Sequence, residues 1–230
     1  MYKNIKVIAF DADDTLWVNE TYFRDAELEF AKLLAQYETA NTINQELFKT
    51  EIRNLQLYGY GIKGFVLSMI ECALELSNYS IKPKVIHEII EIGKQMLNKP
   101  IELLPEIDEV LKTLQPKYKL ILATKGDLLD QERKLQKSNL LHYFHHIEVM
   151  TDKKATDYKK LIKHLDIHPS QFLMIGNSLK SDVLPVLEIG AAAIHVPFHT
   201  TWIHEEVSEM ETSDKNYHTV LNIKEVLPLF

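Results

Sequence analysis

Three acidic residues follow the first hydrophobic segment of the chain and could bind a metal ion. Ile5–Phe10 is apolar except for Lys6, and Asp11, Asp13 and Asp14 come directly after it. An apolar run of this length, stopped by turn-forming residues, predicts a buried β-strand. Two carboxylates this close would repel each other unless a cation or a shared proton compensates them, and Mg²⁺ is the hard cation that prefers oxygen ligands. The alternative is that Asp13, Asp14 and Thr15 cap a helix or form a turn.

Polar residues also follow three later segments that are predicted to be strands. The segments and their polar residues are Lys119–Thr124 with Thr124, Ile147–Met150 with Asp152, Lys153 and Lys154, and Phe172–Ile175 with Gly176, Asn177, Ser178 and Asp182. The carboxyl ends of parallel strands meet at one edge of a sheet, so these side chains are expected to lie together. A hydroxyl, an ammonium and several carboxylates suit phosphoryl transfer, which needs positioning and neutralisation of charge on the phosphoryl oxygens.

The order of the predicted elements indicates an α/β core that carries a helical insertion. After residue 118, predicted strands, the last being Ala192–Val196, alternate with amphipathic helices, which predicts a parallel sheet with right-handed crossovers. Only helical patterns lie between the first two predicted strands. We therefore predict a core of residues 1–17 and 102–230 and a helical insertion at 18–101. The predicted helices are Thr21–Tyr37, Ile43–Leu57, Phe65–Leu74, Val85–Leu97, Asp127–Ser138, Thr156–Leu165 and Ser181–Ile189.

Composition narrows the class of protein further. The chain has 230 residues, of which 46% are hydrophobic, as in soluble globular proteins. A net charge of −7 argues against nucleic acid as a partner. No apolar run approaches the roughly 18 residues of a membrane span, and the sequence after Met1 leaves no room for a signal peptide, so a cytoplasmic protein is expected. The single cysteine, Cys72, lies in an apolar helical pattern and is expected to be buried. The ten histidines show no spacing typical of a metal site.

The four groups of polar residues resemble the four motifs of the haloacid dehalogenase (HAD) superfamily. Asp11-Ala12-Asp13-Asp14-Thr15 resembles the first motif, Asp-x-Asp-x-Thr. The second, third and fourth motifs are matched by Thr124, by Lys153, and by Gly176-Asn177-Ser178 with Asp182. The resemblance covers the whole chain, and the insertion falls where this family has its C1 helical cap. It implies a Rossmann-like core with a cap that closes over the site.

The resemblance also implies a role for each catalytic residue. Asp11 would be the nucleophile that forms an aspartyl-phosphate, since a carboxylate is ionised at neutral pH without help. Asp13 would protonate the leaving alcohol and then deprotonate the attacking water. Thr124 would donate a hydrogen bond to a phosphoryl oxygen, and Lys153 would neutralise charge and hold Asp11 in place.

The implied metal ligands include one departure from the family pattern. Mg²⁺ would bind the carboxylate of Asp11, the backbone carbonyl of Asp13 and the fourth motif. The fourth motif usually has an acid where this chain has Asn177, so one negative charge is missing and weaker Mg²⁺ binding is expected. Asp182 would recover part of the charge, directly or through water.

Two further departures concern the first and third motifs. Glycine is usual at the position of Asp14. Proline usually adjoins the third-motif lysine, and because it is absent here, Lys153 and Lys154 remain alternatives. The spacing to Tyr158 favours Lys153.

Four more residues are predicted to contact the substrate. The segment Tyr58–Phe65 holds three of the seven glycines. In capped relatives such a loop faces the active site, which makes Tyr60 and Lys63 candidates, although a flexible connection between helices is an equal alternative. Lys125 and Gly126 adjoin the second motif and are predicted to reach the phosphate.

Asp13 distinguishes between reactions within the superfamily. Dehalogenases and phosphonatases resemble the rest of the pattern but lack this second acid. The sequence therefore predicts a Mg²⁺-dependent phosphoric monoester hydrolase that acts on a small phosphorylated metabolite, with sugar phosphates and nucleoside monophosphates as the leading classes. The alternatives are a phosphomutase acting on a sugar phosphate and a catalytically weak binding protein. A monomer or homodimer without nucleic-acid or membrane partners is expected.

Overall fold

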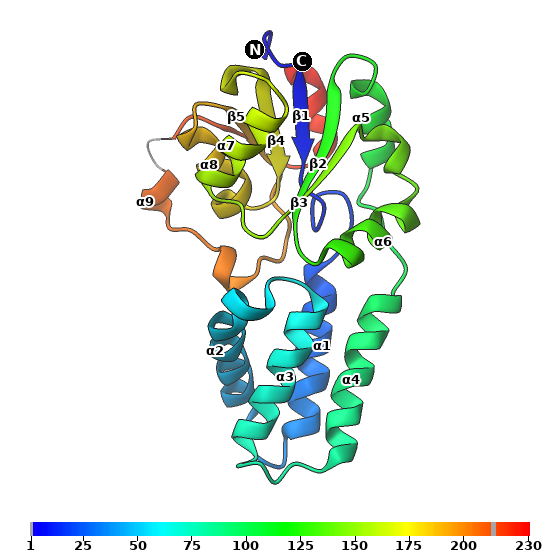
Figure 1. The fold of residues 1–230 in the computed structure, drawn as a ribbon, viewed down its shortest axis with the longest axis vertical. Helices are drawn as coiled ribbons and strands as arrows, with labels where there is room; N and C mark the ends of the chain where they lie inside the picture. The colour runs from blue at the N-terminus through cyan, green and yellow to red at the C-terminus, as the bar shows by residue number, and fades with distance from the viewer. Residues whose placement is uncertain (1, 213–214) are drawn as a thin grey trace. The chain divides into compact units, whose positions relative to one another are not determined.

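The computed structural model describes residues 2–212 and 215–230, which form two compact units (Figure 1). The first unit comprises Met1–Glu20, Ile101–Lys125 and Gln131–Phe230. The second comprises Thr21–Pro100 and Gly126–Asp130. Relative to the proposed insertion at 18–101, residues 18–20 and Ile101 group with the first unit, while 126–130 group with the second.

The first unit is built on a parallel sheet of six strands in the order β3-β2-β1-β4-β5-β6. The strands are β1 (Val7–Phe10), β2 (Lys119–Lys125), β3 (His146–Met150), β4 (Phe172–Gly176), β5 (Ala192–His195) and β6 (His218–Thr219). The predicted parallel α/β sheet is confirmed. β6 was not predicted, because two residues are too few to produce a recognisable pattern.

The sheet register brings the strand ends together at one edge. Phe10, the last residue of β1, pairs with Leu122 of β2 on one side and with Ile175 of β4 on the other. The residues that follow these positions therefore lie on neighbouring strands at the carboxyl edge of the sheet.

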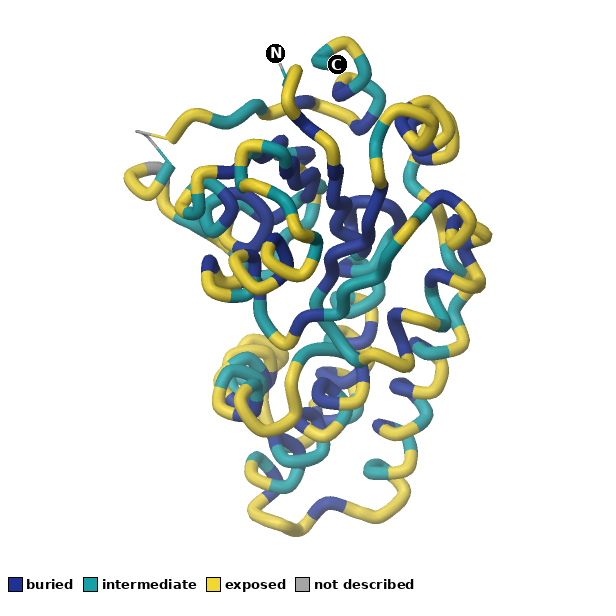
Figure 2. The backbone as a smooth tube through the Cα atoms, turned by 45° about the horizontal axis from the view of Figure 1, so that its top comes forward, coloured by how far each residue is buried: buried dark blue, intermediate teal, exposed yellow. Residues whose placement is uncertain are grey.

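Both faces of β1 are buried, which explains its uninterrupted apolar sequence. Ile8 and Phe10 pack into a core on one face, and Val7 and Ala9 pack into a second core on the other. Successive side chains of a strand point to opposite faces, so a strand covered on both sides must be apolar at every position. Figure 2 shows this buried centre in dark blue beneath helices that are exposed on their outer sides.

Helices cover both faces of the sheet. They are α5 (Ile107–Leu114), α6 (Leu128–Ser138), α7 (Ala155–His164), α8 (Leu184–Glu188) and α9 (Glu209–Thr212). Further helical turns are η1 (Leu141–Tyr143), η2 (Pro169–Gln171), η3 (Leu179–Val183), η4 (Ile203–Glu205) and η5 (Ile223–Leu229). α5 was not predicted, although Ile107, Val110, Leu111 and Leu114 form a regular buried face. The C-terminal apolar segment packs back on the sheet, since Val220, Ile223 and Val226 join the core.

The predicted α-helix Ser181–Ile189 is wrong in its first three residues. Residues Leu179–Val183 form a π-helical turn, and α8 begins only at Leu184. Pro185 has no N–H, so the carbonyl of Ser181 lacks the usual donor four residues later. The hydroxyl of Tyr158 donates to that carbonyl instead, at 2.9 Å.

The second unit consists mainly of four helices, α1 (Glu20–Leu34), α2 (Ala40–Tyr58), α3 (Ile62–Leu76) and α4 (Pro83–Asn98). Their apolar faces share a core that contains Phe30, Met69 and the buried Cys72. Gly59 and Gly61 join α2 to α3 with φ angles of 69° and 107°, which favour glycine. Within the described residues, no helix is long and apolar enough to span a membrane.

Candidate active site

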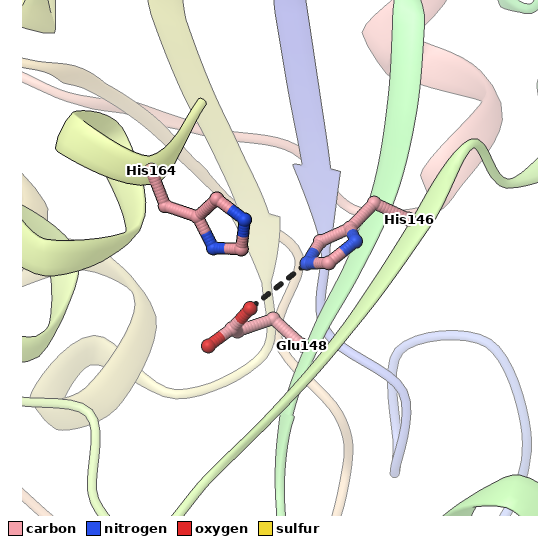
Figure 3. Close-up of side chains that lie close together, drawn as sticks. All are labelled: His146, Glu148 and His164. Atoms are coloured by element: carbon pink, nitrogen blue, oxygen red, sulfur yellow. Dashed lines mark hydrogen bonds and ion pairs between the residues drawn. The ribbon is translucent and has the colours of Figure 1, made fainter. Parts of the chain in front are cut away.

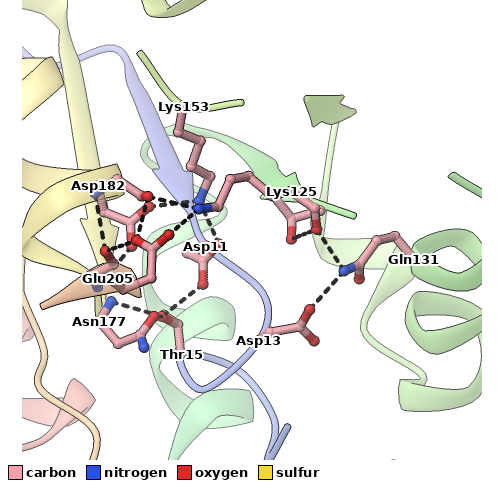
Figure 4. Close-up of polar contacts among 12 residues, drawn as sticks. Asp11, Asp13, Thr15, Lys125, Gln131, Lys153, Asn177, Asp182 and Glu205 are labelled. Atoms are coloured by element: carbon pink, nitrogen blue, oxygen red, sulfur yellow. Dashed lines mark hydrogen bonds and ion pairs between the residues drawn. The ribbon is translucent and has the colours of Figure 1, made fainter. Parts of the chain in front are cut away.

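A buried lysine joins two carboxylates at the carboxyl edge of the sheet. Lys153 Nζ lies 2.5 Å from Asp11 Oδ1 and 2.6 Å from Asp182 Oδ1 (Figure 4). Lys153 is only 3% exposed, Asp11 is 7% exposed and Asp182 is 1% exposed. Burial alone would lower the pKa of Lys153, but the two carboxylates raise it above its usual range. Lys154 is exposed and pairs with Asp152 at 2.9 Å, so the geometry favours Lys153 as the third-motif lysine.

The backbone around Asp182 explains the glycine of the fourth motif. Asp182 Oδ2 accepts a hydrogen bond from the backbone N–H of Ser178 at 3.0 Å. A Cβ atom on Gly176 would lie 2.2 Å from the same oxygen. Any side chain at position 176 would therefore displace Asp182 from Lys153.

Three donors hold the carboxylate of Asp13. Asp13 Oδ1 accepts from Trp17 Nε1 at 2.7 Å and from Lys134 Nζ at 2.9 Å, and Oδ2 accepts from Gln131 Nε2 at 2.7 Å. Both oxygens of the Asp13 carboxyl group therefore have a donor, which fixes the orientation of the side chain. Lys134 and Gln131 were not predicted as site residues, because charged and amide side chains on a helix normally face solvent.

Asp14 has a structural role that accounts for its departure from the family pattern. Its φ of 61° lies in the left-handed region, where glycine is most easily accommodated and aspartate is tolerated. The carboxylate accepts hydrogen bonds from the backbone N–H groups of Asn19 at 2.8 Å and Glu20 at 3.0 Å. Asp14 therefore caps the beginning of α1, as one of the two readings of this segment anticipated.

The side-chain amide of Asn177 lies against the oxygens that a metal ion would share. In one orientation its oxygen accepts from Thr15 Oγ1 at 3.2 Å. In the other, its nitrogen donates to that hydroxyl at 3.2 Å, to the backbone carbonyl of Asp13 at 3.2 Å and to Asp11 Oδ2 at 3.3 Å. The first orientation turns the amide oxygen toward two further oxygens, an arrangement that a cation stabilises. Asp11, the carbonyl of Asp13 and Asn177 therefore form a donor set that fits Mg²⁺.

Asp182 is less suited to contact the same ion directly. One of its oxygens is bound to Lys153 and the other to the backbone of Ser178. Burial raises the pKa of Asp11 to about 7, although Lys153 opposes the shift. A divalent cation beside Asp11 would stabilise its ionised carboxylate, whose charge burial makes unfavourable.

The charge at position 177 should set the affinity for Mg²⁺. Replacing Asn177 with aspartate adds a negative ligand and is expected to lower the dissociation constant for Mg²⁺ about tenfold, equivalent to about 1.4 kcal/mol. Isothermal titration calorimetry would measure it. Asn44→Asp, at an exposed position of α2, adds the same charge and should leave the affinity unchanged. Unchanged or weaker binding by Asn177→Asp would show that Asn177 is not a ligand.

Glu205 enters the site from the C-terminal part of the chain and was not predicted. Its carboxylate pairs with Lys125 and accepts from Ser178 Oγ and Ser181 Oγ, each at 2.5 Å (Figure 4). Burial alone would raise the pKa of Glu205, but Lys125 and the two hydroxyls lower it to about 2. Lys125, predicted to reach the phosphate, thus contacts Glu205 and also Ser181 Oγ at 2.9 Å.

The remaining predicted site residues are Thr124, Gly126, Tyr60 and Lys63. Thr124 is buried near the end of β2, where its hydroxyl donates to the carbonyl of Lys125 at 3.2 Å. Gly126, Tyr60 and Lys63 belong to the second unit, where Lys63 Nζ pairs with Asp127 Oδ1 at 2.9 Å. Asp127 also accepts from the backbone N–H of Asp130 at 3.1 Å and thereby caps the beginning of α6.

Comparison with known proteins agrees with this fold. A family model described as haloacid dehalogenase-like hydrolase matches residues 5–190. The chain is similar to a haloacid dehalogenase-like family hydrolase from Xanthomonas campestris, with 38% identity, a TM-score of 0.85, and coverage of 95% of this chain and 87% of the other. The chain therefore belongs to the haloacid dehalogenase-like hydrolases.

More distant structures share the fold only. A protein described as a predicted phosphoglycolate phosphatase from Haemophilus somnus 129PT has 16% identity and a TM-score of 0.66. L-2-haloacid dehalogenase from Xanthobacter autotrophicus, with chloropropionic acid covalently bound, has 14% identity and a TM-score of 0.65. Each comparison covers 98% of both chains. A search of curated proteins found no significant match.

Proposed function

We propose that this hydrolase is a Mg²⁺-dependent phosphatase that cleaves small phosphorylated metabolites through an aspartyl-phosphate on Asp11. The observation that carries the proposal is the second carboxylate, Asp13, which shares a loop with Asp11 but has separate contacts. Asp11 is bound to Lys153, whereas Asp13 is held by Trp17, Gln131 and Lys134. Two carboxylates in different surroundings can act as nucleophile and as acid or base.

In the first step, Asp11 attacks the phosphorus atom. A carboxylate oxygen bonds to phosphorus while the bond from phosphorus to the ester oxygen breaks. Asp13 transfers a proton to that ester oxygen, so the alcohol leaves neutral. Lys153 neutralises charge near Asp11, and the hydroxyl of Thr124 donates to a phosphoryl oxygen.

In the second step, water hydrolyses the aspartyl-phosphate. Asp13, now ionised, accepts a proton from water as the water oxygen bonds to phosphorus. The bond from phosphorus to Asp11 breaks, which releases inorganic phosphate and restores both carboxyl groups. The contacts with Trp17, Gln131 and Lys134 orient the carboxyl group of Asp13 for this proton transfer.

Mg²⁺, held by Asp11, the carbonyl of Asp13 and Asn177, would supply positive charge that polarises the phosphoryl group. Lys125 would contact the phosphate once released from Glu205, and Gly126 would offer its backbone nearby. Tyr60 and Lys63 of the second unit are proposed to select the rest of the substrate. The protein would act in the cytoplasm as a monomer or homodimer.

A substrate panel tests the proposed reaction against its alternatives. The panel contains an aryl phosphate, sugar phosphates, nucleoside monophosphates and 2-chloropropionate, each with Mg²⁺ or with EDTA. We expect phosphate release from esters that depends on Mg²⁺, with no chloride release. Chloride release without phosphate release would identify a dehalogenase. An isomerised sugar phosphate would identify a mutase, and no turnover of any compound would favour a binding protein.

A further inference from the structure

Two histidines and a glutamate meet away from the catalytic residues. His146 and Glu148 belong to β3, and His164 is the last residue of α7 (Figure 3). One potential ligand atom from each lies within 4.8 Å of the others. His146 Nε2 is 2.9 Å from Glu148 Oε2, and the ring centroids of His146 and His164 are 5.4 Å apart. The sequence showed no such cluster, because 18 positions separate the two histidines.

The fold explains why these side chains converge. His146 and Glu148 are two residues apart on a strand, so they point to the same face. They pair in register with Ile121 and Ala123, whose side chains lie in the core that α7 covers. The end of α7 therefore brings His164 over the same face of β3. All three residues are at least partly exposed, so an ion from solvent can reach them.

An ordinary ion pair does not account for the whole cluster. His146 and Glu148 could form a pair by themselves, and a histidine is favourable at the end of any helix. Neither reason directs the ring of His164 toward the other two side chains, as Figure 3 shows. Two imidazoles and one carboxylate are a recurrent ligand set for zinc and related metals.

We propose that His146, Glu148 and His164 bind a divalent transition-metal ion, with Zn²⁺ as the best-suited member of the class. In a tetrahedral zinc site the ligand atoms are about 3.4 Å apart, given bonds of about 2.1 Å. His146 Nε2 and Glu148 Oε2, now 2.9 Å apart, would separate by about 0.5 Å on binding, and ligand atoms as far as 4.8 Å apart would close by about 1.4 Å through rotation of the exposed His164 side chain. Water would complete the coordination.

This ion would join the beginning of β3 to the end of α7. The segment between them carries Lys153, at the opposite end of the β3–α7 pair. Binding closes a loop of residues 146–164 and is expected to stabilise this segment. The metal would support the position of Lys153 without touching the reacting atoms.

Zn²⁺ titration of the full chain in excess Mg²⁺ tests this site. The excess Mg²⁺ occupies the proposed catalytic metal position, and isothermal titration calorimetry measures the remaining Zn²⁺ binding. We expect a single Zn²⁺ ion per chain, with its affinity lowered by at least about tenfold in His164→Ala, since loss of even an indirect metal contact has an effect of that size. His87→Ala, which removes an exposed histidine of α4, should leave binding unchanged.

Two further variants separate this site from the catalytic one. Asp11→Asn should retain the Zn²⁺ ion, and Glu148→Gln should weaken its binding as His164→Ala does. Zn²⁺ should also raise the melting temperature of the native chain but not that of His164→Ala. Absence of Zn²⁺ binding, loss of binding in Asp11→Asn, or equal binding by native protein and His164→Ala would each overturn the proposal.

Discussion

Replacing Asp11 with asparagine is expected to reduce phosphatase turnover by at least about a thousandfold, equivalent to about 4 kcal/mol in the activation barrier. The amide cannot form the aspartyl-phosphate, and it loses the charge that binds Lys153 and would bind Mg²⁺. The shape of the side chain is preserved, and Asp182 still pairs with Lys153 at 2.6 Å, so the fold should survive. Initial rates with saturating aryl phosphate and Mg²⁺ measure the effect.

A matched control distinguishes this effect from a general loss of charge. Asp25→Asn makes the same change at an exposed position of α1, where the side chain is 65% exposed and pairs with Lys99. This variant should retain full turnover. If Asp11→Asn were as active as Asp25→Asn, Asp11 could not be the nucleophile.

Replacing Lys153 with methionine should destabilise the protein by about 3–5 kcal/mol and also abolish turnover. The change leaves the carboxylates of Asp11 and Asp182 buried without their shared cation. Mg²⁺ should restore part of the stability, because it would compensate Asp11. Urea unfolding with and without Mg²⁺ measures both free energies.

The neighbouring lysine provides the control for this second prediction. Lys154 is 74% exposed in its side chain and pairs only at the surface with Asp152, so Lys154→Met should change stability by no more than about 0.5 kcal/mol. Adding Asp182→Asn to Lys153→Met should recover stability, since it removes one uncompensated charge. Equal effects of Lys153→Met and Lys154→Met would refute the assignment.

The strand ends could be predicted from sequence because they depend on local patterns. A strand buried on both faces must be apolar, so Val7–Phe10 and Phe172–Gly176 were visible as short apolar runs. The polar residue after each run then marks the carboxyl edge of the sheet. The catalytic candidates Asp11 and Lys153 were found in this way.

Other parts of the site depend on contacts between distant positions and left no local signal. Glu205 reaches Lys125 across 80 positions, and Lys134 reaches Asp13 across 121. α5 was missed because it is short and lies between predicted elements, although its buried face is regular. The π-helical turn at Leu179–Val183 could have been anticipated from Pro185, which lacks the N–H that an α-helix requires.

The most direct measurement is to trap the aspartyl-phosphate in Asp13→Asn. An aryl alcohol leaves without needing a proton, so this variant should still form the intermediate, whereas its hydrolysis, which needs Asp13 as a base, should be slow. Acid quenching followed by peptide mass spectrometry should therefore find one phosphoryl group on Asp11, after a burst of one aryl alcohol per chain. Turnover of the aryl phosphate without any such adduct, or an adduct on another residue, would contradict the proposed mechanism.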